Sequence, residues 1–261
     1  MLKDITLGQY FPGNSIAHKL DPRTKILLVT LYIIALFSAK GWMGYAVMVV
    51  TLAACVKVSH VGLRALVRGL KPLVFIIAFT GILNMFFTPD THYLWEWGIL
   101  RVSVKGIENA LFMVIRIMLL VMGTFLMTYT TSPIRLTDGL ESLLNPLKKI
   151  HVPVHELAMM MAIALRFIPT LIEETDKIMS AQKARGADFD SGNIFQKAKA
   201  LVPILVPLFI SAFRRADELA TAMECRCYHG GEGRTKLHVL KYQRRDYVAL
   251  AGGVVILALV V

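Results

Sequence analysis

Five stretches of almost uninterrupted apolar residues dominate the chain and predict membrane-spanning helices. They cover residues 26–39, 45–56, 72–87, 106–129 and 247–261. The fourth has the length that crosses a bilayer with some tilt, whereas the first, second and fifth are shorter and need flanking residues. The pattern predicts an all-α integral membrane protein with about five transmembrane helices.

Residues beside these stretches predict where the helices begin and what joins them. Asp21 is a suitable N-cap residue, and Pro22 fits the first helical position. Residues 57–71 contain four basic side chains and predict an ordinary inside loop. Residues 88–105 are rich in aromatic side chains, which predicts a loop at the headgroup level.

A long polar block separates the fourth and fifth stretches. Leucines at helical spacing after Pro133 predict a first, amphipathic helix at the membrane surface. The chain therefore divides into residues 1–130 with four membrane helices, a helical domain at 131–245 and a C-terminal membrane helix at 246–261.

Two long helices are expected to follow in the 131–245 block. One runs from about Pro153 to Arg185, with a kink at Pro169, and the next runs from Asn193 to Arg226. At 1.5 Å per residue, a helix of 30 residues is about 45 Å long. Such helices are longer than a small domain requires. Their length predicts that they reach toward partner proteins.

A motif near the end of each long helix occurs twice. Residues 176–186 and 217–227 align at an offset of 41 residues, with Asp, Ala and Arg matched. Each copy ends on an arginine between two small residues: Ala184, Arg185 and Gly186 in the first, and Cys225, Arg226 and Cys227 in the second. A single terminal arginine is usually a solvated charge that favours the helix dipole, but repetition at matched register favours a binding role. Arginine suits binding because its charged, planar fork matches a carboxylate.

An apolar stripe leads along each long helix to its arginine. The candidates for a close helix crossing and a partner surface are Met160, Ala164, Leu171 and Ala181 on the second helix of the block and Leu205, Ala212, Ala216 and Ala222 on the third. Small residues let two helices approach closely, and the neighbouring methionines supply an adaptable apolar surface.

Composition and charge support this interpretation and add an orientation. The 261 residues are 56% hydrophobic with a formal net charge of +11, which is too apolar for an ordinary soluble domain. Of 29 Lys and Arg, 4 lie in residues 1–25, 4 in 57–71 and 17 in 131–245. This bias places the N-terminus and the 131–245 block in the cytoplasm and the C-terminus outside, with no need for a nucleic-acid partner. Three cysteines give no disulfide framework.

Two other features have a plain and a functional interpretation. Cys225 and Cys227 with His229 form a weak zinc pattern, because no distant ligand pair accompanies them, and small side-chain size explains both cysteines better. No metal or cofactor is therefore expected. Arg116, inside the fourth stretch, either extends to the interface or pairs within the bundle with a group such as Asn84.

These features together resemble the transmembrane T component of energy-coupling factor transporters. The residues that carry the resemblance are Leu20 to Lys25, Thr131 to Pro133 with the leucine-rich helix, Arg166 to Pro169, and the paired arginine motifs. The resemblance implies a non-catalytic scaffold in the plasma membrane of a prokaryote. It implies two cytoplasmic cassette ATPases, each binding Arg185 or Arg226, and a membrane S component that binds a vitamin or transition metal. Cys225 and Cys227 depart from the family's usual Ala and Gly.

Two alternatives belong to other classes of protein. A membrane enzyme acting on lipid-linked substrates is disfavoured, because no carboxylate cluster or His pair lies at the membrane boundary. A scaffold that binds anionic lipid through its basic block requires no ATPases. Co-purified ATPases, turnover by the lone chain and lipid binding alone distinguish the three.

Overall fold

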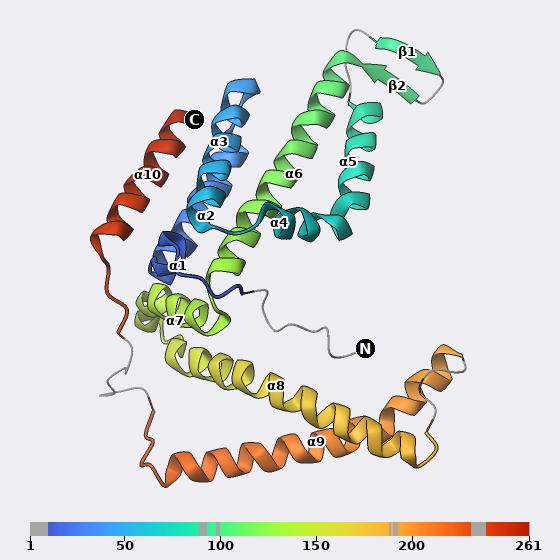
Figure 1. Cartoon of the computed structure of the whole chain (residues 1–261), viewed down its shortest axis with the longest axis vertical. Helices are drawn as coiled ribbons and strands as arrows, with labels where there is room; N and C mark the ends of the chain where they lie inside the picture. The colour runs from blue at the N-terminus through green and yellow to red at the C-terminus, as the bar shows by residue number, and fades with distance from the viewer. Residues whose placement is uncertain are drawn as a thin grey trace. The chain divides into compact units, whose positions relative to one another are not determined.

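The chain folds almost entirely into α-helices. The computed structural model describes residues 10–88, 93–97, 100–187, 189, 193–230 and 239–260 (Figure 1). Contacts divide the chain into two compact units, one of residues 8–142 with 239–261 and the other containing residues 143–238. The first is called the membrane unit below and the second the coupling unit, and each is described by itself. The predicted all-α membrane fold is confirmed.

The membrane unit is a helical bundle whose chain order is interrupted by the coupling unit. Its elements are α1 Ile16–Lys19, α2 Pro22–Ser38, α3 Gly41–Ser59, α4 Leu63–Leu70, the 3-10 turn η1 Lys71–Leu73, α5 Val74–Phe87, β1 Tyr93–Trp97, β2 Leu100–Ser103, α6 Val104–Thr130, most of α7 Pro133–Leu144, and α10 Arg244–Val260. Leu36, Met48 and Leu66 are completely buried between these helices. Helix α10, last in the chain, packs against α2, the first long helix (Figure 1).

Helix boundaries in the membrane unit follow local chemistry. The Asp21 carboxylate accepts a hydrogen bond from the Arg23 amide at 2.9 Å, and Pro22 occupies the first helical position, as predicted. Ser103 caps α6 in the same way, accepting from the Gly106 amide at 2.9 Å. Gly106 lets the start of α6 approach the backbone of α5 closely, because a Cβ there would lie 2.7 Å from the Met85 carbonyl oxygen.

Two expected loops contain regular structure instead. The basic connection forms helix α4, in which Leu66 and Leu70 are buried and Arg64 and Arg68 are exposed. Because these pairs are four residues apart, each lies on one face of a helix, and the packed leucine face stabilises it. Strands β1 and β2 pair antiparallel where an irregular loop was expected, in keeping with the aromatic content of residues 93–97.

Within the part of the chain that the structure describes, four helical segments have the length and apolar composition to cross a membrane. They are Gly41–Ser59, Leu63–Phe87, Val104–Thr130 and Val154–Ala184. Helices α2 and α10 have 17 residues each, which corresponds to about 26 Å of helix, slightly less than a hydrocarbon core. Their assignment as spans, and the cytoplasmic placement of Val154–Ala184, stay predictions.

The coupling unit contains two long helices. After the 3-10 turn η2 Asn145–Ile150 come α8 Val154–Ala184 and α9 Ile194–Glu224, each of 31 residues. The predicted boundaries of both helices are confirmed within two residues. Both helices continue past their internal prolines, at Pro169 in α8 and at Pro203 and Pro207 in α9.

Candidate functional site: two matched helix ends and the contact between their helices

Helix α8 ends in a hydrogen-bonded C-cap that carries Arg185. Gly186 adopts a left-handed conformation with φ of 89°. Its amide donates to the Lys183 carbonyl at 3.0 Å, and the Ala187 amide reaches back to the Gln182 carbonyl at 3.0 Å. This pair of bonds is a Schellman motif, in which a left-handed residue satisfies the last carbonyls of the helix.

Helix α9 ends in the same way, 41 residues later. Cys227 takes the position of Gly186, with φ of 55°. Its amide donates to the Glu224 carbonyl at 2.8 Å, and the Tyr228 amide donates to the Met223 carbonyl at 3.1 Å. The repeat seen in the sequence is thus a repeat of backbone geometry, and cysteine at position 227 does not change it.

Both arginines are presented to solvent by these caps. Arg185 and Arg226 are exposed, as are Ala184, Cys225 and Cys227 beside them. Each arginine immediately precedes the left-handed residue, where the chain leaves the helix. The helix macrodipole places partial negative charge at this end, which favours a cation there. The forked donors of an exposed guanidinium can bind a carboxylate of a partner.

A polar cluster joins α8 to α9. The Glu174 carboxylate accepts hydrogen bonds from Ser211 Oγ at 2.5 Å and from Arg215 Nη2 at 2.6 Å. The side chains of Glu174 and Arg215 are 23% and 36% exposed, so this ion pair is only partly screened by water. Two donors on one carboxylate fix the rotation of both helices at this level.

A second contact explains how a proline is accommodated. Pro207 has no amide hydrogen, so the carbonyl of Pro203, four residues earlier, loses its partner within the helix. Gln182 Nε2 of α8 donates to that carbonyl at 3.4 Å. The side chain of one long helix therefore satisfies a backbone group freed in the other.

These contacts set the direction of the two helices. Glu174 meets Ser211, and Gln182, further along α8, meets Pro203, earlier in α9, so the helices run antiparallel. Arg185 and Arg226 then lie on opposite sides of the crossing, up to about 40 Å apart at 1.5 Å per residue. Figure 1 shows the C-terminal ends of α8 and α9 at opposite ends of the pair.

The residues predicted for the crossing and the partner surface are largely open to solvent. Ala164, Ala181, Ala216 and Ala222 are exposed, as are Met160 and Leu205, whereas Leu171 and Ala212 are half-buried. Among the described side chains, the hydrogen bonds between α8 and α9 come from other residues, and Ile204 is the buried position of α9. A role for the exposed residues in binding a partner stays a prediction.

The membrane unit holds Arg116 against aromatic side chains. Its Nε donates to Tyr45 Oη at 2.8 Å, and its guanidinium carbon lies 5.6 Å from the Phe37 ring centroid and 5.7 Å from that of Tyr45. Asn84, the partner suggested from the sequence, instead donates to the Thr80 carbonyl in its own helix. Arg116 therefore pairs inside the bundle, with a hydroxyl and two aromatic faces.

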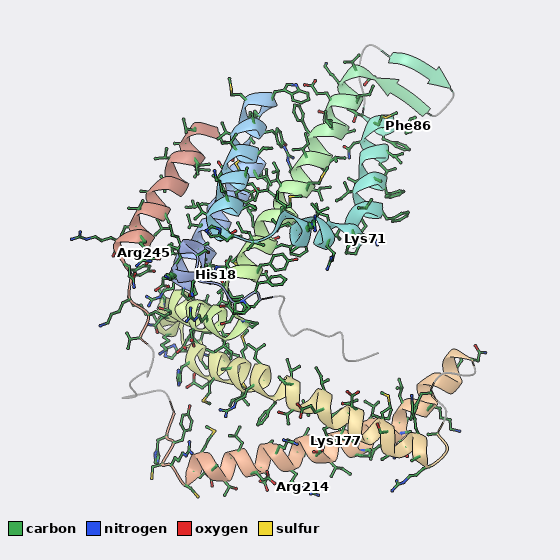
Figure 2. The ribbon with its side chains drawn as sticks, viewed as in Figure 1. His18, Lys71, Phe86, Lys177, Arg214 and Arg245 are labelled. Atoms are coloured by element: carbon green, nitrogen blue, oxygen red, sulfur yellow. The ribbon has the colours of Figure 1, made fainter. Side chains whose placement is uncertain are left out.

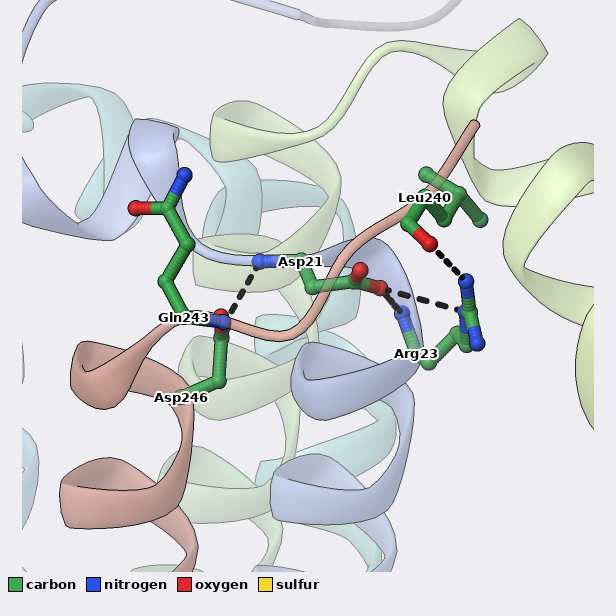
Figure 3. Close-up of polar contacts among 5 residues, drawn as sticks. All are labelled: Asp21, Arg23, Leu240, Gln243 and Asp246. Atoms are coloured by element: carbon green, nitrogen blue, oxygen red, sulfur yellow. Dashed lines mark hydrogen bonds and ion pairs between the residues drawn. The ribbon is translucent and has the colours of Figure 1, made fainter. Parts of the chain in front are cut away.

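A polar cluster that sequence reasoning missed surrounds the start of α2 (Figure 3). Asp246 Oδ1 accepts from the Asp21 amide at 2.9 Å, and its Oδ2 accepts from the Gln243 amide at 2.8 Å. Arg23 Nη2 donates to the Leu240 carbonyl at 2.8 Å. Asp246 lies three residues after Gln243, the spacing at which an acidic side chain can reach back to the amide that precedes its helix, and this spacing was available in the sequence.

The cysteines near the end of α9 are free thiols. Cys225 and Cys227 are exposed, and His229 Nδ1 lies 2.8 Å from the Cys227 carbonyl oxygen. Over the described parts of the chain, no three His, Cys, Asp or Glu side chains gather into a metal-binding group.

Comparison with known proteins gives a consistent family. The CbiQ family model, described as a cobalt transport protein, matches residues 13–237. The energy-coupling factor transporter transmembrane protein EcfT of Ruminiclostridium cellulolyticum is 53% identical over 261 residues, covering 100% of this chain and 97% of the relative. EcfT of Clostridium kluyveri is 57% identical over 95% of this chain and 93% of the relative. EcfT of Bacillus subtilis is 46% identical over 99% of this chain and 98% of the relative.

The match extends over the membrane helices and over both arginine motifs. The chain therefore belongs to the EcfT/CbiQ family, and it is a non-catalytic transmembrane component of an energy-coupling factor transporter rather than a membrane enzyme.

Proposed function

We propose that this chain couples two cytoplasmic cassette ATPases to a substrate-binding membrane S component. The observation that supports this most strongly is the matched pair of helix ends. Each of the two exposed arginines lies in its own helix cap, and the two caps have the same pattern of hydrogen bonds. The two helices run in opposite directions. Two equivalent ends facing apart suit two copies of one kind of socket, which a pair of ATPase subunits provides.

Each arginine docks in a groove on one ATPase and binds a carboxylate there. The guanidinium remains charged at any physiological pH and donates two parallel hydrogen bonds to a carboxylate. Ala184 and Gly186 beside Arg185, and the two cysteines beside Arg226, are small enough to let the helix end enter a groove. The contact is worth roughly 2–5 kcal/mol when both charges lose water on docking.

The S component covers apolar faces of α8 and α9. Met160 is 55% exposed and Leu205 is 46% exposed, and Phe209 and Phe213 on α9 are more exposed still. Large apolar side chains exposed at helical spacing mark an interaction surface, and methionine adapts to more than one partner. The exposed alanines, Ala181 and Ala216 among them, let a partner helix approach closely.

This assembly lies in the plasma membrane of a prokaryote. The N-terminus and residues 131–245 are cytoplasmic, where the ATPases are, and the C-terminus is outside. The S component holds the substrate, a vitamin or a transition metal ion. The chain itself transmits the motion that follows ATP binding and hydrolysis.

The test is co-purification from native membranes with substitutions at the two helix ends. Arg185→Ala and Arg226→Ala should each weaken ATPase binding, and the double variant should release both ATPases while the S component stays bound. Lysine at either position should rescue only in part, because it keeps the charge and loses the fork. Arg214→Ala is the matched control, since Arg214 is also an exposed arginine of α9 (Figure 2).

The outcomes separate the two interfaces. The docking role is contradicted if the double alanine variant retains both ATPases and takes up a radiolabelled panel of B vitamins and Co²⁺ normally. Ala216→Trp should displace the S component and leave the ATPases bound, because bulk at that position keeps a partner helix away. Unchanged S-component binding by that variant removes α9 from the proposed surface.

A further inference from the structure

The segment that carries α8 and α9 joins the membrane unit through two peptide connections. The chain leaves the membrane unit after Ser142 and returns to it at Val239. On the outgoing side, α6 ends at Thr130 and the chain passes through Thr131 into α7. On the returning side, residues 239–243 lead into α10. These two connections give movement of the segment a covalent route into the bundle.

One buried lysine holds the outgoing connection. Lys25 Nζ donates to the Thr130 carbonyl at 2.8 Å and to Thr131 Oγ1 at 3.0 Å. All three residues are buried. Further along, a Cβ on Gly139 of α7 would lie 3.0 Å from Pro22 Cβ, so α7 also packs closely on the start of α2. The end of α6 and helix α7, through which the chain passes toward the coupling unit, are thus attached to the first turns of α2.

The same stretch of α2 holds the returning connection. Arg23 donates to the Leu240 carbonyl at 2.8 Å, and its guanidinium lies 4.9 Å from the Tyr242 ring centroid. The Asp21 amide donates to Asp246 at 2.9 Å, and Asp246 is 2% exposed (Figure 3). Burying a carboxylate costs free energy unless the group is hydrogen-bonded. The two amide donors therefore hold the Asp246 side chain in this position.

One five-residue stretch therefore contacts both connections: Lys25 contacts the outgoing side, and Asp21 and Arg23 contact the returning side. Asp21, Arg23 and Lys25 are called the α2 anchor below. Helix α2 continues from the anchor into the bundle, where it packs against α6 and α10. A displacement of either connection acts on one end of a helix that crosses the bundle, and packed helices move as rigid elements.

We propose that Arg23 and Lys25 are positioning residues that transmit movement of the coupling unit to α2, and through α2 to the membrane bundle. This inference rests on the proposed function, because it assigns a route to the coupling between the ATPases and the S component. It assigns a second role to the Leu20–Lys25 motif, which otherwise only begins a helix.

The test measures hydrogen–deuterium exchange in the full complex, with and without ADP and orthovanadate. In the unmodified complex, the trapped nucleotide should change exchange in α8 and α9 and also in residues 20–31. Lys25→Met removes the hydrogen bonds that hold the outgoing connection, and Arg23→Met removes the hydrogen bond that holds the returning one. Each should reduce the nucleotide effect at residues 20–31, and the double variant should abolish it, while the effect in α8 and α9 persists.

A matched control and a second variant keep the comparison decisive. Lys19→Met makes the same substitution at an exposed lysine outside the anchor and should leave both effects intact. Asp246→Asn, which keeps one carbonyl acceptor, replaces the anchor variants if these do not assemble. A purely structural role predicts lower thermal stability with an unchanged nucleotide effect at α2.

The outcomes distinguish this inference from the proposed function. A nucleotide effect at residues 20–31 that survives in the double variant overturns the anchor role. Absence of any nucleotide effect in α8 and α9 of the unmodified complex contradicts the proposed coupling function itself.

Discussion

Asp246 accepts a hydrogen bond from the backbone amide of Asp21 at 2.9 Å, across 225 residues of sequence. The same carboxylate caps its own helix through the Gln243 amide. One side chain thus satisfies backbone donors at the N-terminal ends of α2 and α10, the first and last long helices of the membrane unit. Negative charge at two helix N-termini is favoured by both macrodipoles.

Removing this carboxylate should destabilise the membrane unit. Asp246→Ala leaves the buried Asp21 amide without an acceptor, at a cost of about 1–3 kcal/mol. The expected result is a lower Tm in detergent, with Asp246→Asn intermediate because it retains one acceptor oxygen. Asp217→Ala, at an exposed carboxylate of α9, is the control and should change Tm little. Equal Tm values for the Ala variant and the unmodified chain contradict the bridging role.

Exchanging the charges at the α8–α9 contact should reveal the coupling between them. Glu174→Arg places two cations together and Arg215→Glu places two anions together, so each single change should speed hydrogen exchange in both helices. The double exchange should restore part of the protection, since the pair is re-formed with opposite polarity. Arg214→Glu makes the same charge change on the neighbouring residue and serves as control. Additive effects of the two single changes show that the pair is not coupled.

Glycine at position 227 should stabilise the end of α9. A left-handed conformation costs a non-glycine residue about 1–2 kcal/mol, whereas glycine loses about 0.5–1 kcal/mol through its freedom in the unfolded chain. The balance favours Cys227→Gly by up to about 1.5 kcal/mol. Exchange of the two backbone amides that close the cap, the one at position 227 and that of Tyr228, should slow. Gly186→Ala is the reverse experiment at α8 and should speed exchange there, because φ is 89° and no contact compensates.

The native thiols report the orientation of the coupling unit. With the chain expressed alone, a membrane-impermeant maleimide should leave Cys225 and Cys227 unlabelled in intact cells and label them after permeabilisation. Met43→Cys supplies the opposite control, since Met43 is 80% exposed at the end of α3 that is expected outside. Labelling of the native thiols in intact cells reverses the orientation and removes the access that cytoplasmic ATPases need.

Local sequence determined the elements of this protein and the paired helix ends. The Asp21 cap and the starts and ends of α8 and α9 were predicted, because each depends on residues within about one or two turns of each other. The 41-residue repeat was predicted as well, because it is a match between two short motifs that can be compared directly in the sequence. The basic charge of residues 57–71 predicted a loop, whereas the four-residue spacing of Leu66 and Leu70 is typical of the packed helix that forms there.

Tertiary structure decided which residues meet across the bundle. Lys25 with Thr130, Arg116 with Tyr45, and Glu174 with Arg215 are far apart in the chain, and several other acids, bases and hydroxyls were equally plausible partners. Long-range pairs are selected by how helices pack, because burial forces each polar group to find a partner within hydrogen-bond distance. The sequence therefore indicated two arginine ends and a membrane bundle, whereas only the folded chain showed that one stretch of α2 holds both connections between them.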